Sequence, residues 1–196
     1  MMGRSLELMG MASFNVFLGM VLTVTFLNQG GGNKPSRLSE ESVSAFIQEM
    51  AEVAHGKKEG LDQYGITTWF MDHIDDNSLF TATVNIAQAN GDENQQTLEM
   101  NRMNYISHIL QEIKGVQERE SHLNIEYVKI NEDGRTASVI YTSIDKGRMP
   151  VADQGTEYTV PVTGMSYCEQ KVALRNATMK VSGGNCTTNI TVAESF

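Results

Sequence analysis

Four polar residues within five positions carry the clearest indication of chemistry in this sequence. Asp72 and His73 are followed by Asp75 and Asp76. On a helix, Asp72 and Asp76 lie on one face, and His73 beside carboxylates fits a general base of raised pKa or a metal ligand. The same residues fit a solvated helix end and a turn, because adjacent aspartates before Asn-Ser are common in turns. We favour the turn and keep His73 with Asp72 as the candidate catalytic pair.

Beyond that segment the sequence carries no complete catalytic or metal-binding motif. His55 ends a helical pattern, where an imidazole is more often a partner of the helix dipole than a base. His108 and His122 lack the spacing of a zinc site, and no His-x-x-x-His or Cys-x-x-Cys occurs. Serine nucleophile motifs and phosphate-binding glycine patterns are also absent. We therefore predict no metal and no cofactor, and we lean against catalysis.

Length and charge restrict the classes of protein to consider. The chain has 196 residues, enough for one domain with a full core. Its 15 Lys and Arg against 24 Asp and Glu give a formal net charge of −9. Such a surface repels phosphate backbones and anionic lipid headgroups, and no basic patch offsets it. We therefore expect no nucleic-acid partner and no lipid binding through the body of the domain.

Residues 8–27 form an uncharged apolar run, LMGMASFNVFLGMVLTVTFL. About twenty residues at 1.5 Å rise match a bilayer core of roughly 30 Å. An uncleaved anchor, a cleaved signal peptide and a core helix are the three interpretations, and the glycine-rich residues 30–36 detach the run from the rest of the chain. We predict a membrane anchor or signal segment over 1–28, a flexible linker over 29–38 and a folded domain over 39–196. The first two interpretations place that domain in the cell envelope, periplasmic or otherwise extracytoplasmic, anchored to the inner membrane or exported after cleavage.

The first half of the domain is mainly helical by its periodicity. Ser39 is a good N-cap, and apolar residues then recur at spacings of three and four up to His55. Thr and Val content indicates one strand between the later helices. The predicted elements after the first helix are a helix over 60–75, a turn over 75–78, a strand over 79–86 and a helix over 97–114.

The stretch 122–144 predicts a β-hairpin. Apolar and polar residues alternate with a period of two on both sides of Asp133-Gly134, where glycine takes positive φ at low steric cost. Pairing the apolar faces fixes a register. That register joins Ile130 with Thr136, Tyr127 with Val139 and Ile125 with Tyr141.

The remaining chain alternates as strand, and its two cysteines fall within one further hairpin. Asn176-Ala177 fits the turn. An uninterrupted register from that turn sets Cys168 opposite Asn185. One extra residue, taken up as a β-bulge at Gly183-Gly184, sets Cys168 opposite Cys186 instead. For an exported chain we predict a Cys168–Cys186 disulfide, with two buried free thiols as the alternative.

The order helix, helix, strand, helix and then long antiparallel strands is that of an α+β cone. Three segments resemble the nuclear transport factor 2-like superfamily, in its SnoaL-like and ketosteroid-isomerase-like branches: WFMDHIDD leading into LFTATV, then TLEMNRMNYISHILQEI, then INEDGRTA. The resemblance implies a curved antiparallel sheet wrapped on about three helices, here preceded by one N-terminal hydrophobic helix. Inner-membrane subunits of type IV secretion systems share this layout.

The resemblance also implies a pocket at the wide end of the cone. Enzymes of the ketosteroid-isomerase-like branch use a tyrosine and carboxylic acids in that cavity. No position of this sequence matches their pattern well enough to receive a catalytic role. The aromatic residues expected to line a ligand pocket are Trp69, Phe70, Tyr105, Tyr127 and Tyr141.

These observations favour a membrane-tethered, envelope-exposed domain that works by binding and not by catalysis. Its partner would be a small apolar ligand or an envelope protein. Two alternatives stay open. One is an isomerase- or dehydratase-like enzyme that uses His73 and Asp72 as an acid/base pair, and the other is a structural homo-oligomer built through the open face of the sheet.

Overall fold

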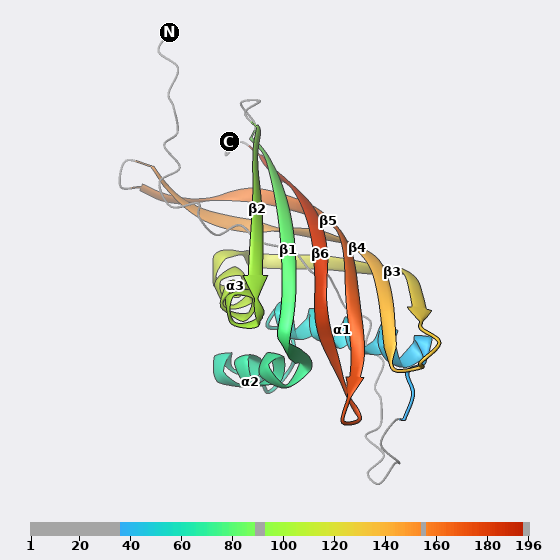
Figure 1. The fold of residues 1–196 in the computed structure, drawn as a ribbon. Helices are drawn as coiled ribbons and strands as arrows, with labels where there is room; N and C mark the ends of the chain where they lie inside the picture. Colours follow the sequence, from blue (N-terminus) through green and yellow to red (C-terminus); the bar gives the residue numbers. More distant parts are fainter. Residues whose placement is uncertain (1–35, 89–92, 154–155, 194–196) are drawn as a thin grey trace.

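The computed structural model describes residues 36–88, 93–153 and 156–193. These residues form one curved, six-stranded sheet with a layer of helices against it (Figure 1). The helices are α1 (Glu40–Ala54), α2 (Gln63–His73) and α3 (Arg102–Gly115). The strands are β1 (Ile74–Gln88), β2 (Glu93–Asn101), β3 (Gln117–Ile130), β4 (Thr136–Asp153), β5 (Thr156–Arg175) and β6 (Thr178–Val192). The predicted α+β cone is confirmed.

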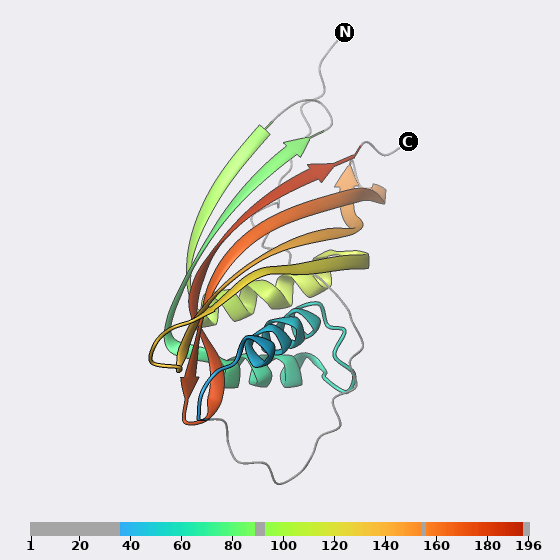
Figure 2. The same cartoon turned by 90° about the vertical axis from the view of Figure 1, so that its right-hand side faces the viewer.

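The sheet has the strand order β2-β1-β6-β5-β4-β3. Neighbouring strands are antiparallel except for β1 and β6, which run parallel because the last strand returns beside the first in the same direction. The sheet bends along its strands, and all the described helices lie against its concave face (Figure 2). The convex face carries no helix among the described residues (Figure 2).

Helix α1 begins where the sequence predicted. The Ser39 hydroxyl accepts a hydrogen bond from the Ser42 N–H at 3.1 Å, and the Ser42 hydroxyl accepts one from the Ser39 N–H at 3.0 Å. This reciprocal cap satisfies two backbone donors that the first turn leaves open. The helix ends before Gly56, whose φ of +66° is the left-handed conformation typical of a helix stop. Its buried face consists of Val43, Phe46, Ile47, Met50, Ala51, Val53 and Ala54.

The third helix is shorter than predicted, because residues 97–101 belong to β2. They pair with residues 79–83 of β1. Helix α3 begins only at Arg102, where the Asn101 side chain accepts a hydrogen bond from the Asn104 N–H at 2.9 Å. A short segment that continues a helical periodicity can equally form an edge strand, and the neighbouring strand decides between them.

The predicted turn over 75–78 was wrong. These residues continue β1, which begins at Ile74 directly after α2. The parallel pairing of β1 with β6 shifts register between Ile74 and Leu79. Local composition indicated a turn here because irregular strand and turn draw on the same small polar residues.

The β3–β4 hairpin forms with a register one residue away from the prediction near its turn. Ile130 pairs with Ala137 and Tyr127 with Ile140, whereas Ile125 pairs with Tyr141 as predicted. The register shifts between Ile125 and Tyr127, so these two side chains no longer share a face.

The β5–β6 hairpin forms as the bulged alternative of the sequence prediction. Asn176 and Ala177 at the turn both have positive φ, 50° and 66°. The register shifts between Lys171 and Val172, which leaves one extra residue before Gly183 on β6. Cys168 then lies opposite Cys186, and the two form the predicted disulfide.

The predicted membrane segment, residues 8–27, lies outside the described residues, as do most of the predicted linker and the whole of the predicted segment 1–28. Among the helices that the structure describes, none is long and apolar enough to cross a bilayer.

The disulfide should contribute substantially to stability. It closes a loop with a sequence separation of 18 residues, for which the loop-closure relation gives about 3 kcal/mol. We therefore expect replacement of Cys168 and Cys186 by valine to lower the free energy of unfolding of the full chain by about that amount, measured by urea denaturation. Alkylation of the denatured, unreduced wild-type chain should add no mass, and two labels without reduction would contradict the bond.

Candidate functional site

A group of ionisable and polar side chains is buried between the helices and the concave face of the sheet. It consists of His55 at the end of α1, Glu112 on α3, Arg119 and Ser121 on β3, and Asp145 on β4, and we call it the interior polar cluster. All but Arg119 are buried, and Arg119 is half-buried. The charges and hydroxyls of these side chains act on one another, as their pKa shifts record. Helices and strands that are distant in sequence therefore supply one site.

His55 and Asp145 face each other at the centre of the cluster. The His55 Nε2 to Asp145 Oδ1 distance is 3.7 Å, with side-chain exposures of 1% and 0%. The distance by itself would permit an ion pair. Burial, together with the charge of Arg119 and Lys57, holds the pKa of His55 well below its usual 6.5. The imidazole is therefore neutral at pH 7, and the contact is between a carboxyl and a neutral ring.

The two carboxyl groups of the cluster differ in protonation. Burial raises the pKa of Asp145 to about 6, and the hydroxyls of Ser121 and Ser143 and the charge of Arg119 oppose that rise. Burial raises the pKa of Glu112 well above its usual value, with the carboxylate of Asp145 adding to the effect and Arg119 opposing it. Asp145 is thus mainly ionised at pH 7, whereas Glu112 is held toward its protonated form. One acid and one carboxylate share the same interior.

A row of hydroxyl groups continues the polar surface across the concave face. Ser143, Ser166 and Thr188 lie side by side on β4, β5 and β6. Ser166 and Thr188 hydrogen-bond at 2.9 Å, and the Ser143 hydroxyl lies 3.4 Å from Asp145 Oδ2. Each of the three is at most 1% exposed. A sheet face that packs on helices is usually apolar, so this row marks an interior built for polar contacts.

Two tyrosines, Tyr105 of α3 and Tyr141 of β4, are also buried between the helices and the sheet. Tyr105 of α3 stacks on Phe80 of β1 at 4.0 Å between ring centres. Burial raises the pKa of Tyr105, to which the charge of Glu112 adds, while a hydrogen bond with Gln170 opposes the rise. Burial likewise raises the pKa of Tyr141. These phenols remain protonated donors at any ordinary pH.

Several buried polar atoms make no hydrogen bond to any described residue. They include both ring nitrogens of His55, Oε1 of Glu112, the Tyr141 hydroxyl and Oε1 of Gln170. Such atoms are rare in folded proteins, and each is normally met by water, an ion or a ligand. A small space of about 10 Å³ beside Tyr105 and Gln170, lined entirely by described residues, has room for about one water molecule.

The cluster lies just beneath the surface at the end of α1. Lys57, two residues after His55, is exposed, yet its charge affects both His55 and Asp145. Gly56 between them packs toward Ile113 of α3.

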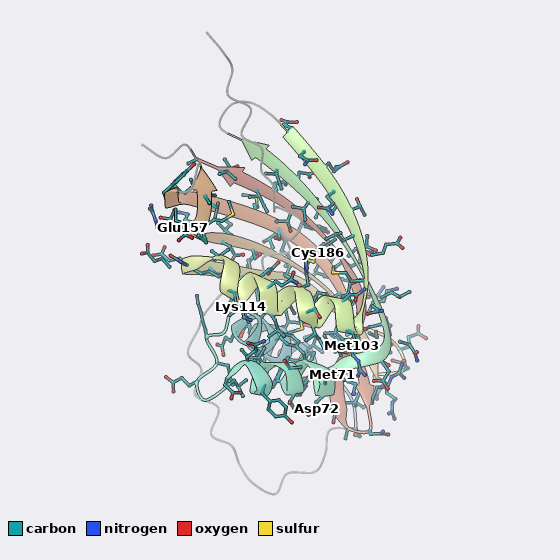
Figure 3. All side chains as sticks on the ribbon, turned by 90° about the vertical axis from the view of Figure 1, so that its left-hand side faces the viewer. Met71, Asp72, Met103, Lys114, Glu157 and Cys186 are labelled. Carbon is teal, nitrogen blue, oxygen red and sulfur yellow. A yellow bond between two sulfur atoms is a disulfide. The ribbon has the colours of Figure 1, made fainter. Side chains whose placement is uncertain are left out.

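The tentative pair His73 and Asp72 is not part of this interior. Asp72 is exposed on α2, outside the space between α3 and the sheet (Figure 3). His73 Nδ1 lies 2.7 Å from the carbonyl oxygen of Trp69, and the two rings stack at 4.1 Å. These contacts hold the His73 side chain against Trp69 of the same helix.

The neighbouring aspartates act as structural ion-pair partners. Asp76 contacts the guanidinium of Arg102, which also donates to the carbonyl oxygen of Met71 at 3.2 Å. Asp75 accepts from Arg175 at 3.1 Å. These contacts fasten the α2–β1 junction to α3 and to the end of β5. The four polar residues between positions 72 and 76 are thus not gathered at one site.

The aromatic residues predicted to line a pocket divide between three places. Tyr105 and Tyr141 are buried inside the cone, and Phe70 is buried in the apolar core. Trp69 is half-buried and packs beside Phe46 of α1, at 6.2 Å between ring centres. Tyr127 is 50% exposed on the convex face. The bulge beside Ile125 turns Tyr127 outward, which is the physical reason that it does not line the interior.

Sequence reasoning missed the residues of the interior polar cluster. One signal was present: Glu112 continues the buried stripe of α3 formed by Tyr105 and Ile109, at spacings of four and three. Asp145 likewise continues the inward alternation of β4 from Tyr141. A charge at a core position indicates a polar interior.

Among the described residues, no group of three or more His, Cys, Asp or Glu side chains is arranged to hold a metal ion. The chemistry that the cluster's own side chains can perform is hydrogen bonding and proton exchange. A protonated Glu112 donates, ionised Asp145 accepts, and neutral His55 can do either.

No family model matches this sequence, and no curated protein matches it significantly. Similar solved structures are found at low sequence identity. A hexachlorocyclohexane dehydrochlorinase (LinA) type 2 is 9% identical, over 80% of this chain and 92% of the other, with a TM-score of 0.49. A protein from Novosphingobium aromaticivorans that is described by inference as a scytalone dehydratase is 10% identical, over 80% of this chain and 88% of the other, with a TM-score of 0.47. The protein Rd1NTF2_04 with long sheet is 10% identical, over 76% and 99%, with a TM-score of 0.37.

The three helices and the curved sheet of the described residues form the α+β cone that the sequence predicted. The neighbours differ from this chain at about nine positions in ten, so the likeness concerns the fold alone. The function of the site therefore depends on its own side chains.

The raised pKa of Asp145 predicts a pH dependence of stability. An acid whose pKa is higher in the folded than in the unfolded state stabilises the fold at pH values below the unfolded-state pKa. That stabilisation is lost as the pH rises through the folded-state pKa. For Asp145 the window runs from its usual 3.8 to about 6, and the loss amounts to about 3 kcal/mol. We expect Asp145→Asn to gain stability relative to wild type by about that amount between pH 4 and pH 7.5.

Urea denaturation at both pH values measures this difference. The exposed Asp72→Asn is the matched control, and its stability relative to wild type should change little over the same range. Equal changes in the two variants would contradict the assignment of the buried carboxyl.

Proposed function

We propose that this domain is a binding module whose ligand contacts the interior polar cluster. The observation that carries the proposal is the set of buried atoms without hydrogen-bond partners among the described residues, above all both ring nitrogens of His55 and Oε1 of Glu112. Leaving such groups unpaired costs about 1–3 kcal/mol each. A ligand that supplies the missing partners recovers that free energy, which favours binding.

The charges of the cluster indicate the chemistry of the ligand. Arg119 is positive and Asp145 is mainly negative at pH 7, while His55 is neutral and Glu112 is held toward its neutral form. The opposite charges balance within the site. The hydroxyl row on β4 to β6 adds further donors and acceptors. We therefore assign a small polar ligand without net charge that carries hydroxyl or amide groups, in place of the apolar ligand expected from the sequence.

The proposal includes a location on the outer side of a membrane. Residues 8–27 are uncharged and long enough for a bilayer. The Cys168–Cys186 disulfide supports an oxidising compartment, because cytosolic thiols are kept reduced. A tether over 8–27 with the cone in the envelope accounts for both features.

Ligand binding is tested on the full chain in detergent. Compounds released from the denatured protein are identified by mass spectrometry, and a panel of glucose, glycerol, acetamide and nicotinamide is added to the stripped protein. We expect at least one compound to raise the Tm of wild type. His55→Phe removes both unpartnered nitrogens at similar size, so it should raise the Tm of the empty protein and weaken binding about tenfold.

His122→Phe is the matched control, because His122 is exposed on β3. It should leave both the Tm and the affinity close to wild type. Equal affinity in wild type and His55→Phe would remove the interior cluster as the binding site.

One observation favours proton-transfer catalysis as a second candidate. The cluster holds an acid with a raised pKa, Glu112, within electrostatic reach of the ionised Asp145, the division of roles that acid–base enzymes use. The same binding experiment separates the two functions. A compound recovered unchanged after incubation supports a binding module, and a compound recovered as an isomer or elimination product supports catalysis.

The location is tested by a reporter that is active only outside the cytoplasm, such as alkaline phosphatase, fused after Phe196. We expect activity from the full chain and its loss when residues 1–28 are deleted, since that segment would direct export. Activity that does not depend on residues 1–28 would contradict the tether.

A further inference from the structure

Three amide side chains are hydrogen-bonded in a row across the outer side of the sheet, and we call Gln95, Asn85 and Asn189 the amide row. Gln95 Nε2 donates to Asn85 Oδ1 at 2.7 Å, and Asn85 Nδ2 donates to Asn189 Oδ1 at 2.8 Å. The three residues are in register on β2, β1 and β6, which lie side by side at one edge of the sheet (Figure 1). Together the three amides carry six N–H donors, and these two bonds use two of them. The row therefore has further donors and acceptors to offer a ligand.

A second row, of hydroxyl groups, runs beside the amide row on the same three strands. Thr97, Thr83 and Thr187 are in register, each two residues from its neighbour in the amide row. The hydroxyls of Thr83 and Thr97 hydrogen-bond at 3.3 Å. The two rows together form a polar surface that is held in place by its own lateral bonds, so little side-chain entropy remains to be lost on binding.

The sheet is hollowed at the amide row. The hollow measures about 580 Å³, which is within the range of about 300–1,000 Å³ that is usual for small-molecule sites. The residues that line it on the outer side are Asn85, Ala87, Glu93, Gln95, Asn189 and Thr191.

Two side chains of β5 extend these rows with an apolar surface. Tyr167 lies opposite Thr187 and is 50% exposed, and Met165 lies opposite Asn189 and is 54% exposed. An exposed ring beside amides and hydroxyls fits a sugar, which has hydroxyl groups at the edge of its ring and C–H groups on the face.

The charge around the rows favours a neutral partner. No side chain of either row is charged. The outward residues that border the rows include Glu93 at one end and Glu99 and Glu169 at the other. An anionic polysaccharide or a phosphate backbone is repelled by this border and by the formal net charge of −9.

The spacing of the amides indicates which neutral sugar fits. Gln95 and Asn189 are separated by two strand spacings, which is about 10 Å and close to the length of one β-1,4-linked disaccharide. Successive rings of such a glycan face opposite ways, so acetamido groups on one side recur once per disaccharide. An acetamido group has one carbonyl and one N–H, and it can pair with a carboxamide side chain through two hydrogen bonds.

We propose that the amide row binds a neutral glycan of β-1,4-linked N-acetylated sugars, with Tyr167 against the face of one ring. Its source is the glycan strands of the cell wall, a choice that rests on the envelope location proposed above. The site is separate from the interior polar cluster because the sheet lies between them. Asn189 is exposed on the outer side of β6, whereas its neighbours Thr188 and Ile190 are buried on the inner side.

Binding is tested on the full chain in detergent by titration calorimetry with N-acetylchitohexaose. We expect a Kd of about 0.1–1 mM, because an open polar surface gains little from excluding water. Cellohexaose has the same linkage without acetamido groups and should bind about tenfold more weakly. Asn85→Ala removes both bonds of the amide row and should weaken binding of the N-acetylated glycan about tenfold.

Asn124→Ala is the matched control, because Asn124 is exposed on β3 at the opposite edge of the sheet. It should leave the affinity at its wild-type value, as should His55→Phe in the interior cluster. Loss of glycan binding in His55→Phe would assign the sugar to the interior and overturn the outer site. Equal affinity for the two hexasaccharides, or wild-type affinity in Asn85→Ala, would also overturn it, as would the absence of any binding.

Co-sedimentation with purified peptidoglycan tests the source of the glycan. We expect the wild-type chain to pellet with it, and we expect Asn85→Ala or an excess of N-acetylchitohexaose to reduce the pelleted fraction severalfold. A chain that binds N-acetylchitohexaose but does not pellet would overturn the cell wall as the source. This outcome is independent of the ligand of the interior cluster, which His55→Phe reports separately.

Discussion

Two single-residue irregularities in the sheet determine which side chains enter the cone. In β3 the register shifts between Ile125 and Tyr127, and in β6 an extra residue precedes Gly183. Side chains alternate along a strand, so each extra residue exchanges the two faces beyond it. The first shift sends Tyr127 to the convex face, and the second brings Cys186 beside Cys168. The outward position of Tyr127 and the cross-strand disulfide both depend on these shifts.

The interior of the cone contains an apolar core and, next to it, the interior polar cluster. Helix α1 and the sheet meet through fully buried residues such as Ile47, Met50 and Val139. His55, Glu112 and Asp145 lie beyond them, on α1, α3 and β4. Burial of such groups without full pairing opposes folding, so the apolar core has to supply the stability of the whole domain. Buried polar groups that are retained although they oppose folding are typical of functional sites.

The polar interior and the outer face lie on opposite sides of one sheet, and strand alternation separates them residue by residue. Ile144 points outward between Ser143 and Asp145, which point inward. A change at Ile144 or Met165 therefore alters the outer face while leaving the cluster in place. The disulfide joins β5 and β6, two of the strands that present both faces.

The sequence alone determined the elements whose signals are local, and the tertiary structure decided what long-range pairing controls. The cap at Ser39, the stop at Gly56 and the turn at Asn176-Ala177 depend on neighbours in the chain, through capping chemistry and backbone permissiveness. Residues 97–101 became strand because β1 offered them partners. His55, predicted as the end of a helix, lies against Asp145, which is 90 residues away in sequence. Local patterns can predict whether such a residue is buried or exposed, but not which distant residue it contacts. Burial among these distant partners sets the pKa values of the residues and therefore the chemistry of the site.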